Sequence, residues 1–514
     1  MNRGALPEDL RGFRVHLVGA KGTGMAALAE ILAARGALLS GSDVPEVFYT
    51  DAILASIGLR PFAGFDASQV GEGVSLVVHS AAYRRDQNPE LLEASRRGIP
   101  LLNYPEALGE LSARADSSGI AGVHGKTTTT AMAGSLVAAL GLPATVLAGS
   151  AVSSFGGRST LIRGERYFVA ETCEYRRHFL SFKPRRIALT SVESDHQDYY
   201  PTYADILAAF VEYALLLPEG GELVYCADDA GAVEAATAAS ARRPDLALLP
   251  YGHRAEGPFR IEQYRAGEGR ALFRLAGFDR DFELRVPGEH LALDACAALA
   301  LAFSLLRDYR SEGAVTGGAR ATGVAASIVA AIRPADLEAA AAALAAFAGS
   351  KRRSELLGEA GGVIFMDDYG HHPTAIRETI RGIKAFWPGR RLVVDFMSHT
   401  YSRTRALFEE FASCLDEADA AVLHKIYASA REAPDPAVSG RGLYEAVAAR
   451  WARAGKTGAG KPGELLYFEE PMEAETELAR RLKPGDLFLT MGAGDNWQLG
   501  AALHEAMKRR GDER

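Results

Sequence analysis

The chain has 514 residues, a formal net charge of −8 and 48% hydrophobic residues. A chain of this length predicts roughly two to four domains, with three the natural number, and it holds enough apolar material for several cores. The acidic balance argues against non-specific nucleic-acid binding, which needs basic patches that neutralise phosphates.

The cysteines and the apolar runs indicate in which cellular compartment the protein is expected. The four cysteines are widely spaced and form no C-x-x-C pair, which favours a reduced cytoplasmic protein over a disulfide framework or a zinc site. The N-terminal residues carry acids and a proline before any apolar run, so we expect no secretory signal. No apolar stretch reaches the ~18–20 residues that a membrane span needs. The alanine-rich stretch near 335–347 is expected to be a helix, and we expect no membrane association.

The first part of the chain predicts a Rossmann-like unit. Residues 13–44 combine a short apolar run, a glycine turn, helical apolar spacing and a second strand, and residues 75–82 predict a further buried strand. Strands that alternate with helices in this way are typical of a parallel sheet. The small polar stretch at 111–119 is expected to be a linker. The first domain is therefore predicted to span residues 1–115.

Two further α/β units follow in the pattern. The second is predicted over residues 116–347, with a helix that begins at Lys126 and strands at 119–123, 167–171, 186–192 and 221–227. Residues 308–323 are rich in glycine, alanine and charge and predict an inserted flexible loop. The third unit is predicted over residues 348–514, with strands at 362–368, 390–396, 420–426, 464–468 and 486–494. The predicted fold is α/β in three domains: N-terminal Rossmann-like, central P-loop ATPase-type parallel sheet, and C-terminal Rossmann-like α/β.

The segment GVHGKT at 122–127 has the parts of a phosphate-binding loop. Backbone N–H groups at a helix N-terminus attract an anion, a lysine adds positive charge at the β- and γ-phosphates, and the next hydroxyl can bind Mg²⁺. Gly122, Gly125, Lys126 and Thr127 supply these groups. The full spacing would place glycine where Ile120 stands, so a helix start capped by polar residues remains an alternative.

Acidic residues end the next two predicted strands. Glu171 ends one of them, and Glu193, Asp195, His196 and Asp198 follow the other. Parallel sheets bind ligands at the carboxyl ends of their strands. A phosphate-bound Mg²⁺ ion is coordinated by one or two protein carboxylates and a hydroxyl oxygen. Acids at strand ends also cap helices, so each is weak evidence alone. Two such ends after the glycine-rich loop favour a metal-binding site.

The first domain carries its own glycine-rich turn. Gly19, Gly22 and Gly24 follow a strand, and Asp43 lies about 20 residues further on, a spacing that by itself would indicate NAD. The glycine order is G-x-x-G-x-G rather than G-x-G-x-x-G, which weakens a dehydrogenase interpretation. A diphosphate on the backbone of this turn fits equally well.

Taken in order, the motifs resemble those of the Mur ligases of peptidoglycan synthesis. The segments that carry the resemblance are GVHGKTTTT, ETCEY, ESDHQD, VPGEH, GSKRRSE, DDYGHHPT, SHTYSRT and MGAGD. They extend through nearly the whole chain. The resemblance implies ligation of L-alanine to the lactyl carboxylate of UDP-N-acetylmuramate through an acyl phosphate, with ATP and Mg²⁺ as cofactors.

The resemblance also implies roles for the candidate residues. Catalytic roles are expected for Lys126, His196, Arg353 and His372. ATP binding is expected from Gly122, Val123, His124, Gly125, Lys126, Thr127, Thr128, His290, Arg353 and Asp368. The UDP substrate is expected at Gly19, Gly22, Thr23, Gly24, Asp43 and Ser80. The amino acid is expected at Tyr369, His399 and Arg403, and Mg²⁺ at Thr127, Glu171 and His196.

Two departures and two alternatives remain. Leu291 and Asp294 stand where members of the family usually have asparagine, so adenine binding is expected to differ here. A UDP-N-acetylmuramate–peptide ligase of wall recycling shares most of these motifs, and so does a non-enzymatic nucleotide-binding paralogue. A monomer or a homodimer is expected, without nucleic acid as a partner.

Overall fold

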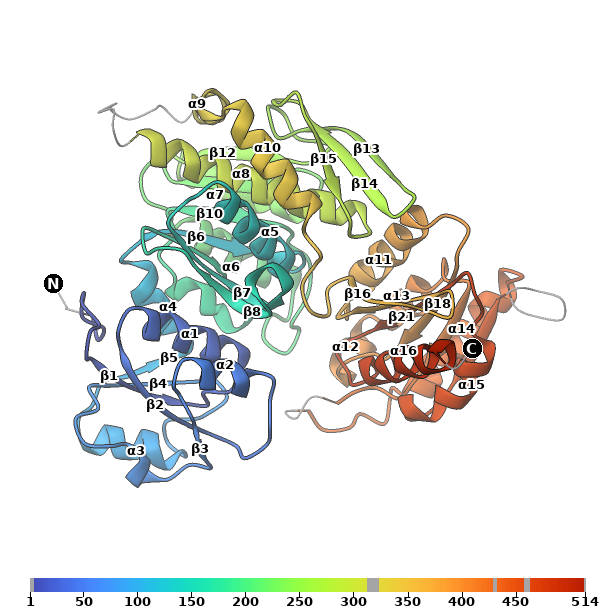
Figure 1. Ribbon diagram of the computed structural model, residues 1–514, viewed down its shortest axis with the longest axis horizontal. Coiled ribbons are helices and arrows are strands. Elements are labelled where there is room, and N and C mark those ends of the chain that lie inside the picture. The colour runs from blue at the N-terminus through green and yellow to red at the C-terminus, as the bar shows by residue number, and fades with distance from the viewer. Residues whose placement is uncertain (1–3, 312–322, 429–431, 457–462, 513–514) are drawn as a thin grey trace.

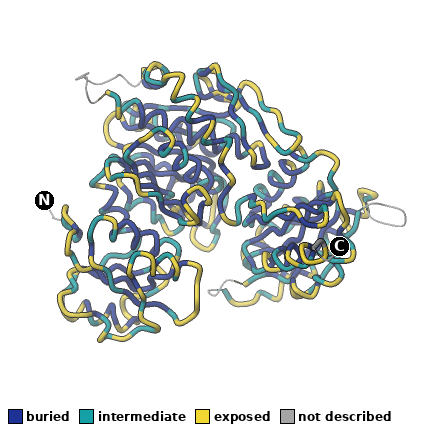
Figure 2. Tube along the Cα trace, in the orientation of Figure 1, coloured by how far each residue is buried: buried dark blue, intermediate teal, exposed yellow. Residues whose placement is uncertain are grey.

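The computed structural model describes residues 4–311, 323–428, 432–456 and 463–512. Three α/β units, each built on its own parallel or mostly parallel sheet, follow one another along the chain (Figure 1). Buried residues concentrate inside each unit (Figure 2). The predicted three-domain α/β fold is confirmed.

The N-terminal domain is a five-stranded parallel sheet in the order β3-β2-β1-β4-β5. This order matches the first five strands of the Rossmann order, namely one mononucleotide-binding half, β3-β2-β1, followed by β4 and β5. Its strands are β1 (Arg14–Val18), β2 (Leu38–Asp43), β3 (Phe62–Ala63), β4 (Leu76–His79) and β5 (Leu101–Asn103). Its helices are α1 (Thr23–Ala34), α2 (Thr50–Ser56), α3 (Pro89–Arg96) and α4 (Tyr104–Ser112).

The central domain is a seven-stranded sheet in the order β12-β11-β10-β6-β9-β7-β8, in which β8 is antiparallel to β7. Helices α5 and α8 pack against each other beside this sheet. The strands are β6 (Asp116–Ala121), β7 (Ala144–Val152), β8 (Arg158–Ile162), β9 (Tyr167–Glu171), β10 (Arg186–Leu189), β11 (Glu222–Cys226) and β12 (Ala247–Tyr251). The helices are α5 (Lys126–Ala139), α6 (Tyr203–Ala214), α7 (Ala230–Arg242), α8 (Glu289–Ser311), α9 (Val324–Ala331) and α10 (Pro334–Ala345).

Helix α8 corrects the expectation that no apolar stretch is long enough for a membrane. By length and composition it could cross one, but 83% of its most apolar 18-residue window is buried inside the protein. A long helix that is apolar on all sides is the core helix of a large domain when other elements surround it. The predicted helix near 335–347 is confirmed as α10.

A small antiparallel sheet was not predicted. It consists of β13 (Ile261–Gly267), β14 (Arg270–Leu275) and β15 (Asp281–Leu284). The turn between the first two strands is Glu268–Gly269, and both residues have positive φ, as a two-residue hairpin turn of type I′ requires. The available signal was the Glu-Gly pair immediately before the short apolar run of β14.

The C-terminal domain is a six-stranded sheet in the order β16-β17-β21-β18-β19-β20, with β16 as its antiparallel edge. The five strands predicted here are confirmed, and β16 was missed. The strands are β16 (Glu355–Ala360), β17 (Val363–Asp368), β18 (Arg391–Phe396), β19 (Ala420–Leu423), β20 (Glu464–Tyr467) and β21 (Asp486–Met491). The helices are α11 (Pro373–Phe386), α12 (Tyr401–Ala406), α13 (Phe408–Cys414), α14 (Gly440–Arg453), α15 (Glu475–Arg481) and α16 (Trp497–Asp512).

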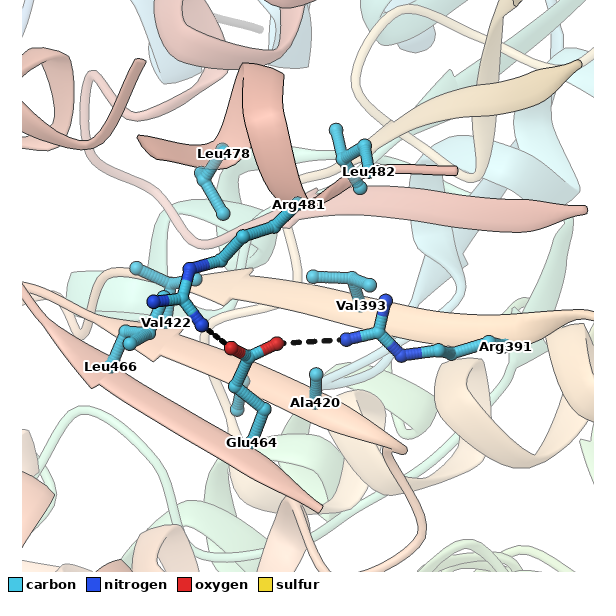
Figure 3. A pocket seen from close by; sticks show the side chains of 10 residues that line it. Arg391, Val393, Ala420, Val422, Glu464, Leu466, Leu478, Arg481 and Leu482 are labelled. Carbon is cyan, nitrogen blue, oxygen red and sulfur yellow. Dashed lines mark hydrogen bonds and ion pairs between the residues drawn. The ribbon is translucent and has the colours of Figure 1, made fainter. Parts of the chain in front are cut away.

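A small cavity lies at the β20 side of this last sheet (Figure 3). Glu464 on β20 pairs with Arg391, whose Nη2 lies 2.9 Å from Oε2, and with Arg481 of α15. The cavity volume of about 10 Å³ is enough for one water molecule. The two arginines and the carboxylate therefore form a structural ion-pair group and leave no room for a substrate.

Two segments differ from their predictions. The polar stretch at 111–119 is not a linker, because it contains the end of α4 and most of β6. Two of its buried serines have satisfied hydroxyls: Ser117 Oγ donates to Ser112 O at 2.7 Å, and Ser112 Oγ donates to Gly109 O at 2.8 Å. The predicted loop at 308–323 begins inside α8, which continues to Ser311, and residues 312–322 lie outside the described residues.

Candidate active site

The loop between β6 and α5 has the conformation that its glycines predict. Gly122 has φ +142° and Gly125 has φ +78°, values at which a side chain is strained. A Cβ atom at Gly122 would collide with Thr190, and one at Gly125 with Asp294. The loop therefore brings its backbone to the N-terminus of α5 without a covering side chain, as an anion site requires.

Lys126 lies at the start of α5 and is held in place from two sides. Its Nζ donates to Gly122 O at 2.5 Å and lies 3.0 Å from Glu174 Oε2. Burial alone would lower the pKa of Lys126, but the carboxylates of Glu174 and Glu171 raise it above its ordinary value. The side chain is thus a largely buried ammonium group that stays charged at neutral pH next to the glycine-rich loop.

Glu174 was not among the predicted site residues. It is 2% exposed and contacts both Lys126 and His196, whose Nε2 lies 3.4 Å from Glu174 Oε1. Burial opposes ionisation, yet the positive charge of Lys126 keeps the pKa of Glu174 below its ordinary value. The signal in the sequence was the second acid of ETCE, three residues after Glu171.

The predicted Mg²⁺ ligands surround the same loop. Glu171 ends β9, and its Oε2 accepts from Gly149 N at 2.8 Å. Within the described residues the Thr127 hydroxyl has no hydrogen-bond partner, so its oxygen is available to a cation. Mg²⁺ prefers oxygen ligands that include one or two carboxylates. Glu171, Glu174 and Thr127 offer such a donor set, so the residues present fit the ion.

A buried ion pair joins the central and C-terminal domains. Arg403 Nη2 on α12 lies 3.0 Å from Asp195 Oδ1, and the two residues are 8% and 3% exposed. Burial would raise the pKa of Asp195, but the Arg403 guanidinium holds it far below its ordinary value. Arg403 was predicted in the amino-acid site. The structure adds that it already has a carboxylate partner from the other domain.

Two histidines and one glutamate meet across the same boundary. His124 of the glycine-rich loop has Nε2 2.8 Å from Glu193 Oε1, and His372 Nδ1 lies 3.9 Å from Glu193 Oε2. The two imidazole rings are 5.0 Å apart. Thr374 of α11 donates its hydroxyl to Glu193 Oε2 at 3.1 Å. His124 and Glu193 belong to the central domain, whereas His372 and Thr374 belong to the C-terminal domain.

The electrostatics of this group follow from its burial. Burial, and then the neighbouring His124, lower the pKa of His372, which favours a neutral imidazole. Burial would raise the pKa of Glu193, but its hydrogen bond to His124 keeps that pKa below the ordinary value. The group therefore combines a neutral histidine with an ionised carboxylate.

The remaining C-terminal candidates gather around the end of β17. Asp368 accepts from Ser354 N at 2.6 Å and from Gly370 N at 2.7 Å, so both of its oxygens hold backbone in place. The Arg353 guanidinium lies 5.1 Å from the centre of the Tyr369 ring. Asp368, at the end of β17, therefore holds two pieces of backbone: the segment before β16 at Ser354 and the loop after β17 at Gly370.

Two predicted histidines are half-buried. Burial and the Arg403 charge lower the pKa of His399 to about 4, and its ring stacks on Tyr427 at 5.9 Å. His290 lies in the first turn of α8, and burial lowers its pKa. Its Nδ1 is buried without a hydrogen-bond partner among the described residues. Both imidazoles are therefore neutral at neutral pH.

The turn after β1 is shaped by aromatic residues. A Cβ atom at Gly24 would lie 2.8 Å from Tyr104 Cζ and would collide with that ring. A Cβ atom at Gly22 would have room, with the Gly19 carbonyl oxygen 3.8 Å away. Asp43 at the end of β2 accepts from Lys21 N at 2.6 Å. Its carboxylate thus orders the turn itself. The structure brings the predicted Gly19, Gly22, Thr23, Gly24, Asp43 and Ser80 to one edge of the sheet.

The two departures from the family pattern have different surroundings. Leu291 is 4% exposed and belongs to the main apolar core. Asp294 is buried beneath the glycine-rich loop, where Thr129 Oγ1 donates to its Oδ1 at 3.1 Å. Burial raises the pKa of Asp294 to about 7. This carboxyl group is therefore partly neutral at neutral pH.

Three stretches of the chain match models of one protein family. Residues 14–116 match the Mur ligase family catalytic domain, residues 120–302 the Mur ligase middle domain, and residues 352–494 the Mur ligase glutamate ligase domain. Two relatives are called UDP-N-acetylmuramate–L-alanine ligase. The Treponema pallidum protein is 50% identical over 508 residues and 99% of each chain. The Desulfitobacterium hafniense protein is 35% identical over 95% of this chain and 99% of its own.

Solved structures share the fold. UDP-N-acetylmuramate–alanine ligase MurC of Thermotoga maritima aligns with a TM-score of 0.71 and 23% identity, over 98% of this chain and 100% of that one. A murein peptide ligase of Psychrobacter arcticus aligns with a TM-score of 0.60 and 22% identity, over 97% and 99% of the two chains. At these identities the alignments establish a common three-domain architecture.

Proposed function

This chain belongs to the Mur ligase family, and we propose that it joins L-alanine to the lactyl carboxylate of UDP-N-acetylmuramate with ATP, in peptidoglycan precursor synthesis. The observation that carries the proposal is the similarity to the Treponema pallidum ligase over the full length of both chains. The lactyl carboxylate attacks the γ-phosphate of ATP and forms an acyl phosphate. The amine of L-alanine then attacks the acyl carbon and displaces phosphate.

In this proposal the glycine-rich loop binds the phosphates of ATP. The backbone of residues 122–125 contacts the β-phosphate, and the Lys126 ammonium exchanges its contact with Gly122 O for phosphate oxygens. Arg353 approaches from the C-terminal domain and adds a second positive charge to the transferred group. Thr127, Glu171, Glu174 and His196 would hold Mg²⁺, which would supply positive charge to the phosphates.

The C-terminal domain contributes the remaining groups. Asp368 faces the ribose, and His290 lies beside the nucleotide with its unpaired Nδ1. Tyr369, His399 and Arg403 surround the amino acid, whose carboxylate competes with Asp195 for the Arg403 guanidinium. In the N-terminal domain, the turn with Gly19, Gly22, Thr23 and Gly24, together with Asp43 and Ser80, binds the UDP group. Closure of the three domains keeps water away from the acyl phosphate.

Phosphate release tests the proposal. The chain is incubated with UDP-N-acetylmuramate, ATP and Mg²⁺, and each of L-alanine, L-serine, glycine and the tripeptide of the recycling ligases is added in turn. We expect the highest kcat/KM with L-alanine. A preference for the tripeptide would identify a peptide ligase, and nucleotide binding without phosphate release would identify a non-enzymatic paralogue.

We propose a cytoplasmic location for this reaction. Its nucleotide substrates are made in the cytoplasm, and all four cysteines are free thiols in the structure. Cell fractionation followed by immunodetection tests the location. Light scattering at several protein concentrations distinguishes a monomer from a homodimer.

A further inference from the structure

The group formed by His124, Glu193 and His372 stands out among the site residues because each member offers a metal ligand. His372 also caps α11, where its Nδ1 accepts from Thr374 N at 3.4 Å. The ligand atoms of the three residues all lie within 4.8 Å of one another. They come from three different segments: the glycine-rich loop, the segment after β10 and the N-cap of α11. The three segments meet only because the central and C-terminal domains meet.

The spacing fits a small transition-metal ion. Ligand atoms bonded to tetrahedral Zn²⁺ at about 2.0–2.1 Å lie about 3.4 Å apart. Glu193 Oε1 lies 2.8 Å from His124 Nε2, and Glu193 Oε2 lies 3.9 Å from His372 Nδ1, so the two imidazoles approach opposite oxygens of one carboxylate. Small rotations of the side chains would bring all three ligands to one ion, with the carboxylate bound through one or both of its oxygens.

Burial and supporting contacts also fit a metal site. The His372 side chain is 6% exposed, and its Nε2 is buried without a hydrogen-bond partner among the described residues. Thr374 donates to Glu193 Oε2 and fixes the orientation of the carboxylate, as residues behind metal ligands commonly do. The side chains of His124 and Glu193 are 25% and 29% exposed, which leaves a path for an ion and a position for water.

We propose that His124, Glu193 and His372 bind one divalent transition-metal ion such as Zn²⁺, which links the central domain to the C-terminal domain. Two imidazoles and a carboxylate with one open position are a ligand set that suits Zn²⁺ and Co²⁺ far better than Mg²⁺. The site is separate from the donor set proposed for Mg²⁺ around Thr127, Glu171 and Glu174. Because the ion spans two domains that must part for product release, its binding inhibits turnover. This last consequence rests on the proposed function, whereas the binding itself does not.

Cobalt provides the test, because Co²⁺ held by nitrogen ligands in a four- or five-coordinate site absorbs visible light strongly, unlike hydrated Co²⁺. Tag-free full-length protein is stripped with a chelator and titrated with Co²⁺ without nucleotide or substrate. We expect a visible band that saturates at one equivalent, is bleached by Zn²⁺ and persists in a large excess of Mg²⁺. A titration without such a band overturns the proposal.

Variants locate the site. His372→Gln and Glu193→Gln should each weaken Co²⁺ binding at least tenfold, and circular dichroism of the metal-free proteins verifies that each variant is folded. His253→Gln is the matched control, since His253 Nε2 lies 2.9 Å from Glu289 Oε1 in an exposed pair without a third ligand. Glu171→Gln should also leave Co²⁺ binding unchanged. If both ligand variants bind Co²⁺ like the wild type, the ion is elsewhere and the assignment is wrong.

The inhibition has its own readout. If the chain has the proposed activity, micromolar Zn²⁺ should lower kcat at saturating substrates and Mg²⁺, and chelation should restore it. A chain that binds Co²⁺ at this site but shows no ligase activity would refute the proposed function and leave the metal site standing. A chain with full ligase activity and no cobalt band would support the proposed function and refute the metal site.

Discussion

Asp294 beneath the glycine-rich loop allows a quantitative prediction. The carboxyl group is buried, and its pKa rises from 3.8 to about 7 because burial disfavours the charged form. Between these two pH values the folded chain holds a proton that the unfolded chain releases. Stability therefore decreases as the pH rises from about 4 to 7, and the loss is complete above that range.

The size of the effect follows from the shift. The penalty on the folded state amounts to about 4 kcal/mol near pH 8 and about 2 kcal/mol near pH 5. Asp294→Asn keeps the shape of the side chain and an oxygen that accepts from Thr129, but it removes the ionisation. The variant should therefore be more stable than the wild type near pH 8, and its advantage should shrink by about half near pH 5.

Urea unfolding at the two pH values measures this difference as a shift in midpoint at unchanged slope. Asp279→Asn is the control, because it makes the same chemical change at a fully exposed carboxylate. An advantage of Asp294→Asn that is equal at both pH values would mean that the effect does not come from ionisation. A destabilised variant near pH 8 would show that the Asp294 charge is favourable in the folded chain, and the reasoning would be refuted.

Three further changes test other contacts. Lys126→Ala should lower kcat/KM for ATP by roughly 10³-fold or more, about 4 kcal/mol, because a buried ammonium next to the phosphates is lost; steady-state kinetics measures it. Gly24→Ala should raise the KM for UDP-N-acetylmuramate, since the new Cβ meets Tyr104, and adding Tyr104→Ala should restore it. Asp195→Asn leaves Arg403 buried without its carboxylate, so small-angle scattering should report a larger radius of gyration as the central and C-terminal domains separate.

Much of the fold could be predicted because the sequence alternates buried apolar strands with helical patterns. Strand β17 and the five-stranded pattern of the C-terminal domain follow directly from short apolar runs. The first half of the buried strand β6 was taken for a linker because its serines are polar, and only the structure pairs Ser117 with the Ser112 carbonyl. Helix α8 was missed as one long apolar element because its charged ends interrupt the pattern.

The candidate site was less accessible to sequence reasoning. The glycine-rich loop is local in the chain, so its shape around Gly125 could be anticipated. The contact of Arg403 with Asp195 spans 208 residues, and no local pattern encodes which of several acids an arginine will meet. Glu174 was passed over for a related reason, since its contacts with Lys126 of α5 and with His196 after β10 join segments that are separate in the chain.

An isotope experiment tests the central claim, that the lysine loop directs the γ-phosphate of ATP to a carboxylate. UDP-N-acetylmuramate labelled with ¹⁸O in its lactyl carboxylate is converted with ATP and L-alanine, and the phosphate released is analysed by mass spectrometry. The account predicts that one ¹⁸O atom appears in each phosphate and that ADP is the other product. Unlabelled phosphate, or AMP in place of ADP, would contradict activation of the carboxylate as an acyl phosphate.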